Sequence, residues 1–321
     1  MAAVVDAHWH LQGHWTAVAG ERDTNFMLDA GDGRYLVKVT HPEESAPAVA
    51  AQVGVLEHLL RVDPDLPVQR PVRSRAGLPT HTYPDDPRRQ VRVVRYLDGT
   101  LRRHAPWQAG LAAQTGHLAA RLDLALASFH HPGCGQSLLW DLRRALELEP
   151  LRVHLRGDPL GATVDDALRR FAALQASLQA CPVQPIHNDL NPSNLLVGTE
   201  SPATLCGIID FGDMIEAPRI QELAVACAYL TDAEDPARAI GDCAEAYQAC
   251  APMPEEELEL LGDLVCTRWT ITVLITEWRA RLQPHNATYI LRNNAAARRG
   301  LALFDGPAQR RLAERLKDST S

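Results

Sequence analysis

Two neighbouring segments carry residue types that could bind a metal or move a proton. Residues 185–197, PIHNDLNPSNLLV, place one His, one Asp and three Asn directly before an apolar strand. A second apolar segment, LCGIID, ends at Asp210. Carboxylate and amide oxygens suit Mg²⁺, and a carboxylate can also orient or deprotonate a hydroxyl group. The two segments therefore predict metal-assisted or acid–base chemistry.

The two apolar segments are separated by the turn GTESPAT, and together they predict a β-hairpin. If the hairpin turns about Ser201 and Pro202, Asn194 faces Asp210 across the strands. Asp189 lies in the loop just upstream. We therefore expect Asp189, Asn194 and Asp210 to meet at the open end of a buried hairpin. One amide oxygen and one carboxylate would serve Mg²⁺, and the other carboxylate would serve a substrate hydroxyl.

The elements that position these residues form two parts with different periodicities. Residues 1–97 read as short strands around one helix, and residues 98–321 read as mostly helical. The predicted fold class is α+β, with a small β-rich N-terminal lobe and a large α-helical C-terminal lobe. The predicted strands are 10–20, 24–30, 34–40, 66–74, 78–83 and 89–97, and the predicted helices are 45–61, 106–129, 165–181, 218–230, 235–249, 254–282 and 286–301, followed by a charged tail.

Composition excludes several classes of protein. The chain has 321 residues, 46% of them hydrophobic and 22% charged, which is typical of a globular protein. No apolar run approaches the ~18–20 residues that cross a bilayer, and the N-terminus lacks the basic start of a secretory signal. The seven Cys are scattered, without a C-x-x-C pair, which favours reduced thiols over disulfides or zinc. We expect a cytoplasmic protein that does not associate with membranes.

Charge is unevenly distributed. Residues 199–263 contain fifteen acidic side chains and only two arginines. Such a block repels phosphate and argues against a nucleic-acid partner. It is either a set of solvated helix faces or a surface that attracts a cationic substrate, and the sequence leaves both open.

Lysine is rare in this chain. Of 32 basic residues only Lys38 and Lys317 are lysine. Lys38 lies in RYLVKVT, an alternating run that predicts a half-buried strand. A compact ammonium suits a single phosphate-oxygen contact better than the broad fork of arginine. The position indicates a phosphate contact, although chance is the simpler alternative.

The motifs resemble those of a known fold. His187, Asp189 and Asn194 fit H-x-D-x-x-x-x-N, and D-F-G follows at 210–212. In this order they resemble the catalytic and metal-binding loops of the protein-kinase-like fold. The forms NPSN and IIDFGD resemble the aminoglycoside phosphotransferase and choline kinase branch, which acts on small molecules. Protein kinases have H-R-D and a long segment ending in A-P-E, whereas this chain has only MIEAPRIQELA. The resemblance covers nearly the whole chain.

The resemblance implies a role for each motif residue in an ATP- and Mg²⁺-dependent phosphoryl transfer. Asp189 would be the base for the substrate hydroxyl. Asn194 and Asp210 would hold Mg²⁺ on the nucleotide phosphates. Lys38 would contact the α/β-phosphates, and His187 would brace the loop by packing and hydrogen bonding.

Two positions depart from the family pattern. The family usually pairs Lys38 with a Glu on the N-lobe helix, but the register here points to Gln52. The only Glu inside that helix is Glu57, about 140° away around the helix, so the two residues cannot share one role. Gln52 faces the core and is the preferred partner, although it could equally be a satisfied polar residue with Glu57 on the surface. Glu222 stands where the family commonly has Asp, and it is expected to brace the catalytic loop.

The nucleotide base is expected against the interlobe strand VVRYLDG. The backbone of Arg95–Leu97 would bond to adenine, with Val94 and Tyr96 marking the two faces of the strand. The phosphate-covering loop VAGERDTNF holds one Gly, so backbone amides and Arg22 or Asn25 would have to cover the phosphates.

That loop, with YLVKVTHPEE, resembles the hydroxylysine kinase group, whose members phosphorylate the hydroxyl of an amino acid or amino alcohol. The expected partner is therefore a small hydroxylated substrate, cationic or zwitterionic, such as 5-hydroxylysine or homoserine. Candidate substrate residues are Asp213, Glu216, Arg268 and Glu277, although Arg268 could instead only pair with the acidic helix. An aminoglycoside kinase and a nucleotide-binding regulatory pseudokinase are the rival functions. The chain could be a monomer or a homodimer.

Overall fold

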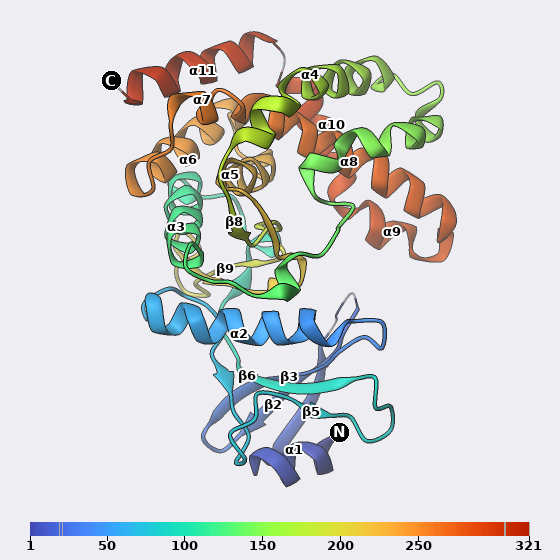
Figure 1. Ribbon diagram of the computed structural model, residues 1–321, viewed down its shortest axis with the longest axis vertical. Helices are drawn as coiled ribbons and strands as arrows, with labels where there is room; N and C mark the ends of the chain where they lie inside the picture. The colour runs from blue at the N-terminus through green and yellow to red at the C-terminus, as the bar shows by residue number, and fades with distance from the viewer. Residues whose placement is uncertain (19, 21, 305, 321) are drawn as a thin grey trace.

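The computed structural model describes residues 1–18, 20, 22–304 and 306–320. A β-sheet with two helices forms one end of the molecule, and a large helical part forms the other (Figure 1). The N-terminus lies at the sheet end and the C-terminus at the helical end (Figure 1). The predicted α+β class is confirmed. Among the described residues, no helix combines the length and the apolar character needed to span a bilayer.

The N-terminal sheet has six antiparallel strands in the order β1-β2-β3-β6-β4, with β5 also paired to β6. Alternating apolar and polar residues produce these strands, because successive side chains point to opposite faces. The strands are β1 (Gly13–Val18), β2 (Thr24–Ala30), β3 (Gly33–Val39), β4 (Pro71–Val72), β5 (His81–Thr82) and β6 (Gln90–Arg95).

The outer face of this sheet is covered by helix α1 (Ala2–Trp9), which the sequence did not predict. Its Val5 and Trp9 pack on the odd-numbered side chains of β3 and β6, such as Val37 and Val93. The indole Nε1 of Trp9 donates to the carbonyl oxygen of Val72 at 2.8 Å. The even-numbered side chains of β3 and β6 therefore face the interior of the molecule.

Helix α2 (Ala46–Val62) lies between the sheet and the helical part (Figure 1). Ser45 caps it by accepting the amide of Ala48 at 3.2 Å. Leu56 and Leu59 of α2 are buried in a core that continues into the C-terminal helices. One hydrophobic core thus joins the two parts.

The C-terminal part is built of helices around two small strand groups. The order β10-β9-β7 forms one sheet, and β8 pairs with β11. Strand β6 of the N-terminal sheet ends at Arg95, and β7 of the next sheet begins at Thr100. The predicted boundary at 97/98 falls between these two strands. The strands are β7 (Thr100–Leu101), β8 (Val183–Ile186), β9 (Leu195–Val197), β10 (Leu205–Ile208) and β11 (Ile215–Pro218). The helices are α3 (Leu111–Leu126), α4 (Gly161–Ala180), α5 (Arg219–Ala228), α6 (Pro236–Cys250), α7 (Glu255–Leu258), α8 (Leu261–Leu282), α9 (Ala287–Ile290), α10 (Asn294–Leu303) and α11 (Gly306–Thr320), with 3-10 turns between some of them.

The hairpin of β9 and β10 exists, but its predicted register is wrong. An irregularity between Leu205 and Gly207 shifts the pairing. The amide of Ile209 donates to the carbonyl oxygen of Asn194 at 2.9 Å. Asp210 therefore lies one residue beyond the position opposite Asn194.

Three further predictions of local structure are corrected. The strands β8 and β11 were missed, because each has only four residues and contains a proline, so neither shows an alternating pattern. The predicted helix 254–282 is broken into α7 and α8, because the chain tightens between them: the amide of Leu260 donates to the carbonyl oxygen of Glu257, three residues back, at 3.1 Å. The charged tail is helical, as α11.

Candidate active site

The loop between β8 and β9 carries the H-x-D-x-x-x-x-N motif and is hydrogen-bonded to helix α5. Glu222 accepts the amide of Asn188 through Oε2 at 2.7 Å, and Gln221 donates to the Asn188 side-chain oxygen at 3.1 Å. All three residues are fully buried. Asn188 adopts a left-handed backbone with φ of 65°, which asparagine tolerates better than most residues. These contacts are those expected of a brace, the role predicted for Glu222.

His187 is fully buried inside the same loop. Its Nδ1 accepts the amide of Asp189 at 3.3 Å, and its Nε2 lies 3.2 Å from the carbonyl oxygen of Ile209. The edge of the ring meets Phe211 of D-F-G, with ring centroids 4.7 Å apart. Burial lowers the pKa of His187 to about 4, against the opposing charge of Asp210. A neutral imidazole with both nitrogens engaged fits a brace and not a proton carrier.

Asp189 lies where the loop meets helix α8. Its Oδ2 accepts the side-chain amide of Asn194 at 2.7 Å, and its Oδ1 lies 3.3 Å from Nη2 of Arg268. Burial raises the pKa of Asp189 to about 6, while the positive charge of Arg268 opposes that shift and the negative charge of Asp210 adds to it. Near neutral pH this carboxylate is ionised and can accept a proton.

Asn194 and Asp210 are the residues predicted to hold a divalent metal, and each presents an oxygen atom. The amide nitrogen of Asn194 is committed to the Asp189 carbonyl and carboxylate oxygens, which leaves Oδ1 as the ligand atom. The pKa of Asp210 is lowered, chiefly by Lys38, so this carboxylate is ionised. Among the described residues, no three His, Cys, Asp or Glu side chains gather into a metal cage. One amide oxygen and one carboxylate are donors that suit Mg²⁺ when phosphates and water complete its shell.

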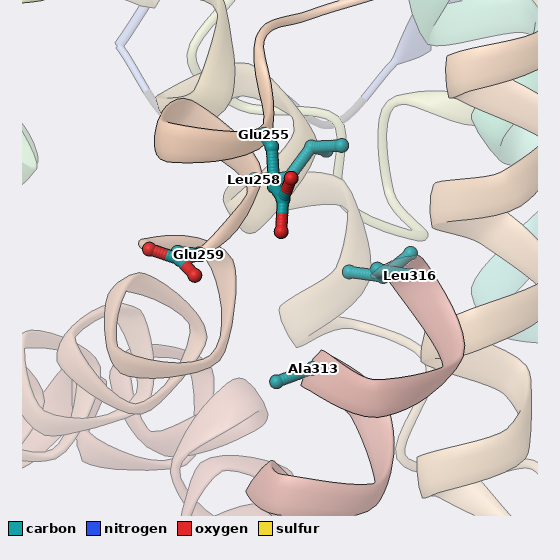
Figure 2. A pocket seen from close by; sticks show the side chains of 5 residues that line it. All are labelled: Glu255, Leu258, Glu259, Ala313 and Leu316. Carbon is teal, nitrogen blue, oxygen red and sulfur yellow. The ribbon is translucent and has the colours of Figure 1, made fainter. Parts of the chain in front are cut away.

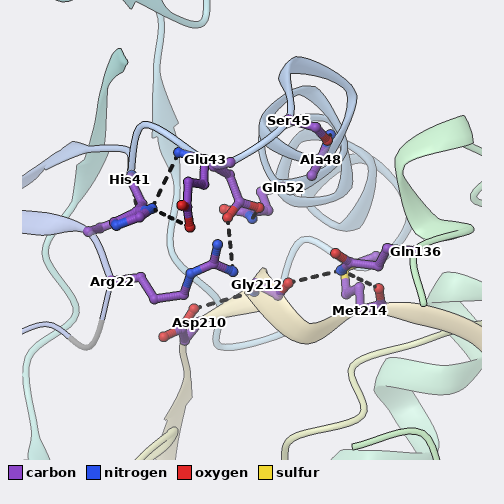
Figure 3. Close-up of polar contacts among 12 residues, drawn as sticks. Arg22, His41, Glu43, Ser45, Ala48, Gln52, Gln136, Asp210, Gly212 and Met214 are labelled. Atoms are coloured by element: carbon purple, nitrogen blue, oxygen red, sulfur yellow. Dashed lines mark hydrogen bonds and ion pairs between the residues drawn. The ribbon is translucent and has the colours of Figure 1, made fainter. Parts of the chain in front are cut away.

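The D-F-G segment is held by a residue that the sequence did not single out. Gln136 donates to the carbonyl oxygens of Gly212 and Met214, at 3.0 and 2.9 Å (Figure 3). Gln136 comes from the irregular region 133–160, where nothing in the sequence marks it. The position of Asp210 thus depends on a segment far from it in the chain.

Lys38 lies on the interior face of the N-terminal sheet, and its ammonium is 3.5 Å from Oδ2 of Asp23. The same carboxylate oxygen lies 3.1 Å from Nη2 of Arg92, the residue opposite Lys38 on β6. Sequence reasoning missed both Asp23 and Arg92. The two residues are 69 positions apart in the sequence, so their contact could be predicted only from the strand register.

Neither predicted helix partner of Lys38 makes that contact in the described structure. Gln52 donates to Oε1 of Glu44 at 3.3 Å, and Glu57 forms an ion pair with Arg73 at 2.7 Å. The predicted pairing of Gln52 with the lysine is corrected, because the carboxylate of Asp23 supplies the partner.

The predicted phosphate-covering loop 18–26 is described except for residues 19 and 21. Arg22 forms an ion pair with Glu44 at 3.3 Å and lies between the start of α2 and the D-F-G segment (Figure 3). Asn25 lies on β2 directly opposite Lys38. Both side chains proposed to cover the phosphates are therefore on the interior side of the sheet.

Val94 and Tyr96 were predicted to lie on opposite faces of the interlobe strand β6, and the structure corrects this. Val93 packs in the outer core with α1, and Val94 packs in the core shared with α2. Val94 and Tyr96 have the same parity, so they cannot mark opposite faces of one strand. Val94 lies on the interior face, where a nucleotide base would be placed.

The backbone donors of the interlobe strand are partly used within the protein. The amide of Arg95 donates to the carbonyl oxygen of Arg70 at 2.7 Å, and that of Tyr96 to the carbonyl oxygen of Arg34 at 2.9 Å. The backbone of Arg95–Leu97 was predicted to bond to adenine, and the amides of Arg95 and Tyr96 are already engaged. The predicted donor is therefore the amide of Leu97.

Arg268 of α8 lies beside the catalytic loop with 2% of its side chain exposed. Its guanidinium donates to the Trp140 carbonyl at 3.3 Å and the Tyr229 hydroxyl at 3.1 Å, and it stacks on both rings. Its Nε, also buried, has no hydrogen-bond partner among the residues that the structure describes. The negative charge of Asp213 acts on Arg268, so these two candidate substrate residues interact electrostatically.

The other two candidate substrate residues are placed elsewhere. Glu277 lies nine residues further along α8, about 13 Å from Arg268 along the axis, and pairs with Arg298 at 2.7 Å. Glu216 is exposed on β11, where its charge adds to the burial that raises the pKa of Cys134 to about 11. Neither residue contacts the catalytic loop in the described structure.

Part of the acidic block 199–263 is used inside the protein. Asp210 and Glu222 belong to the site itself, and several other members pair with arginines from outside the block. These pairs are Arg102–Asp232 and Arg170–Asp263, each at 2.9 Å, and Arg315–Asp242 at 2.6 Å. These pairs neutralise part of the acidic block within the protein.

A separate small pocket lies between α7 and α11, lined by two glutamates and three apolar side chains (Figure 2). Its lining residues are Glu255, Leu258, Glu259, Ala313 and Leu316. None of them belongs to the motifs or contacts described above, so this pocket is not part of the candidate site.

The site geometry agrees with a family match. Residues 14–260 match the model of the phosphotransferase enzyme family. The chain belongs to this family. Its enzyme class, a small-molecule kinase with an alcohol group as acceptor, is confirmed.

Several relatives of this phosphotransferase have the same name. Hydroxylysine kinase of Xenopus laevis is 28% identical over 296 residues, which cover 84% of this chain and 79% of that enzyme. Hydroxylysine kinase of Mus musculus is 27% identical over 213 residues, which cover 63% of this chain and 57% of that enzyme. The predicted resemblance to the hydroxylysine kinase group is confirmed.

Solved structures confirm the protein-kinase-like fold of the phosphotransferase. The amicoumacin kinase hAmiN, in complex with AMP-PNP, Ca²⁺ and Ami, has a TM-score of 0.69 at 17% identity, over 93% of this chain and 91% of that one. A microcompartment-associated aminopropanol kinase has a TM-score of 0.67 at 16% identity, over 98% of this chain and 97% of that one.

Proposed function

We propose that this phosphotransferase transfers the γ-phosphoryl group of ATP to the hydroxyl of a small hydroxylated amino acid, with Mg²⁺ as the metal. The observation that carries the proposal is the buried guanidinium of Arg268, 3.3 Å from the carboxylate of Asp189. It places a fixed positive charge beside the expected proton acceptor. The hydroxylysine kinases named above, and a neighbour crystallised with AMP-PNP and Ca²⁺, support the nucleotide, the metal and the acceptor class.

In the proposed reaction the acceptor hydroxyl lies against Asp189. The carboxylate orients the hydroxyl and takes its proton as the oxygen attacks the γ-phosphorus, while ADP leaves. Asn194 holds one carboxylate oxygen of Asp189, which fixes the direction of the other. Lys38 contacts the nucleotide phosphates, and the Leu97 amide contacts the base. Mg²⁺, held by Asn194 and Asp210, would neutralise charge on the phosphates.

The substrate class follows from the charges beside Asp189. Arg268 and Arg292 both act electrostatically on this carboxylate, so an acceptor with an anionic group is favoured there. The charge of Arg268 favours a substrate carboxylate nearby, and Asp213 offers a counter-charge to an amine. An amino acid such as 5-hydroxylysine or homoserine carries both groups. An aminoglycoside is a polycation, and the positive charge of Arg268 beside Asp189 disfavours it.

The test is coupled ADP release with Mg·ATP across a panel of acceptors: 5-hydroxylysine, homoserine, ethanolamine, choline and kanamycin. We expect turnover on an acceptor with a carboxylate. Asp189→Ala should reduce kcat by at least about 100-fold, since it removes the base. Glu216→Gln, on the exposed edge of β11, is the matched carboxylate control and should retain activity.

The choice of acceptor separates the rival functions. Turnover of kanamycin without turnover of any amino acid would make the protein an antibiotic kinase. ATP binding without turnover of any acceptor would favour the regulatory pseudokinase. Either result would contradict the proposal.

A further inference from the structure

The carboxylate of Asp23 lies between the half-buried ammonium of Lys38 and the buried guanidinium of Arg92, at the expected phosphate site. Its Oδ2 is 3.5 Å from the ammonium of Lys38 and 3.1 Å from the guanidinium of Arg92. Only 14%, 15% and 6% of the side chains of Lys38, Asp23 and Arg92 are exposed. Ion pairs shielded from water are screened far less than surface pairs. This cluster is therefore a strong local constraint.

Strand register creates the cluster. Asn25 on β2, Lys38 on β3 and Arg92 on β6 stand directly opposite one another, so their side chains form one row on the interior face. Two cations side by side in such a row repel each other unless an anion lies between them. Asp23, at the end of the phosphate-covering loop, provides that anion.

The cluster leaves one donor unsatisfied. Nη1 of Arg92 is buried and makes no hydrogen bond within the part of the chain that the structure describes. Burial lowers the pKa of Arg92, against the nearby charges of Asp23, Asp210 and Glu44. A buried donor without a partner is costly, so an additional anion at this place would be stabilised. The phosphates of a nucleotide would supply it.

We propose that Asp23 is the positioning residue of Lys38, replacing the helix glutamate that the fold commonly uses, and that Arg92 holds Asp23 in that position. The proposal rests on the proposed function, because it assumes that Lys38 contacts nucleotide phosphates. The lysine is thereby tied to the covering loop and not to helix α2.

The other carboxylate oxygen of Asp23 joins the covering loop to the connection between β3 and α2. Oδ1 accepts the amide of His41 at 3.1 Å, at the start of the connection between β3 and α2. The same connection carries Glu44, which binds Arg22 of the covering loop and Gln52 of α2. Three ion pairs therefore fasten the covering loop: two join Asp23 to the sheet, and one joins Arg22 to the connection that leads into α2. One of the two Asp23 pairs includes the lysine.

The experiment measures ATP affinity by titration calorimetry and steady-state kinetics for Asp23→Asn in the full chain. Asparagine keeps the acceptor oxygen for His41 and removes only the charge. We expect the Kd and KM for ATP to rise between about 10- and 100-fold, with the KM for the acceptor unchanged. Asp29→Asn, an exposed aspartate on the same hairpin, is the matched control and should match the wild type.

Two further variants distinguish positioning from a merely structural role. In a Lys38→Met background, Asp23→Asn should raise the Kd for ATP by less than about twofold, because its effect acts through the lysine. Arg92→Met should weaken ATP binding as Asp23→Asn does, and Arg92→Lys should restore part of it.

An unchanged ATP affinity in Asp23→Asn, or an undiminished effect without Lys38, would overturn the inference. Failure of the wild type to bind ATP would be a different result, because it would refute the proposed function itself.

Discussion

At the scale of single residues, burial and neighbouring charges give the carboxylates of the site different pKa values. Asp210 sits beside Lys38 and has a lowered pKa, whereas Asp189 is raised to about 6 and Glu222 to about 7, both chiefly by burial. The carboxylate expected at the metal is thus fully ionised, while the expected base titrates closer to neutrality. Such a division is typical of sites that use carboxylates for different tasks.

A pH profile tests the environment of Asp189. Its raised pKa of about 6 predicts that kcat/KM falls as the pH drops through that value, because the protonated acid cannot accept a proton. Arg268 opposes this rise, so Arg268→Met should raise the pKa of Asp189 further and move the acid limb to higher pH. Arg268→Lys keeps the charge and serves as the control. An acid limb that stays in place in Arg268→Met would contradict this view of the site.

At the scale of elements, contiguous motifs were predictable and long-range pairings were not. The residues of H-x-D-x-x-x-x-N and D-F-G could be found because their spacing is local. The pairing of Asp23 with Arg92 could not, since it depends on how β2, β3 and β6 align. The register of β9 and β10 was missed for a similar reason, because the irregularity at Leu205 and Gly207 leaves no mark in the sequence.

The packing of α3 on α6 gives a prediction at this scale. A methyl group at Gly116 would lie 1.9 Å from the carbonyl oxygen of Cys243, so the two helices would have to separate. Gly116→Ala should lower the free energy of unfolding by at least about 1–3 kcal/mol, measured by urea denaturation. Gly54→Ala is the control, because its methyl would meet Phe129 only at 3.8 Å. That change should be neutral or stabilise α2 by about 0.5–1 kcal/mol. Equal effects of the two substitutions would refute the packing argument.

At the scale of the whole molecule, the two parts share one core. Residues of α2 pack with residues of α3, α5 and α8 in a continuous hydrophobic cluster. The D-F-G segment is also fastened to Gln136 of the helical part (Figure 3). The sheet therefore has little core of its own beyond the layer under α1.

The shared core predicts that the two parts unfold together. Thermal unfolding followed by far-UV circular dichroism and by tryptophan fluorescence should give coincident transitions, because Trp9 and Trp269 report on opposite ends of one cooperative unit. Leu59→Ala, fully buried in α2, should destabilise both signals together by about 2–5 kcal/mol. Leu124→Ala, on an exposed position of α3, is the control and should have little effect. Two separated transitions would show that the parts are independent.

The scarcity of lysine has a consequence for covalent chemistry. Lys38 and Lys317 are the only lysines in the chain, and Lys38 is held close to a carboxylate in a site with little access to water. A nucleotide whose phosphate end carries an acylating group would deliver that group to a single interior amine. The resulting amide would identify the nucleotide-contacting residue from one modified peptide. This chain is therefore unusually suited to affinity labelling, because almost every other cation in it is an unreactive guanidinium.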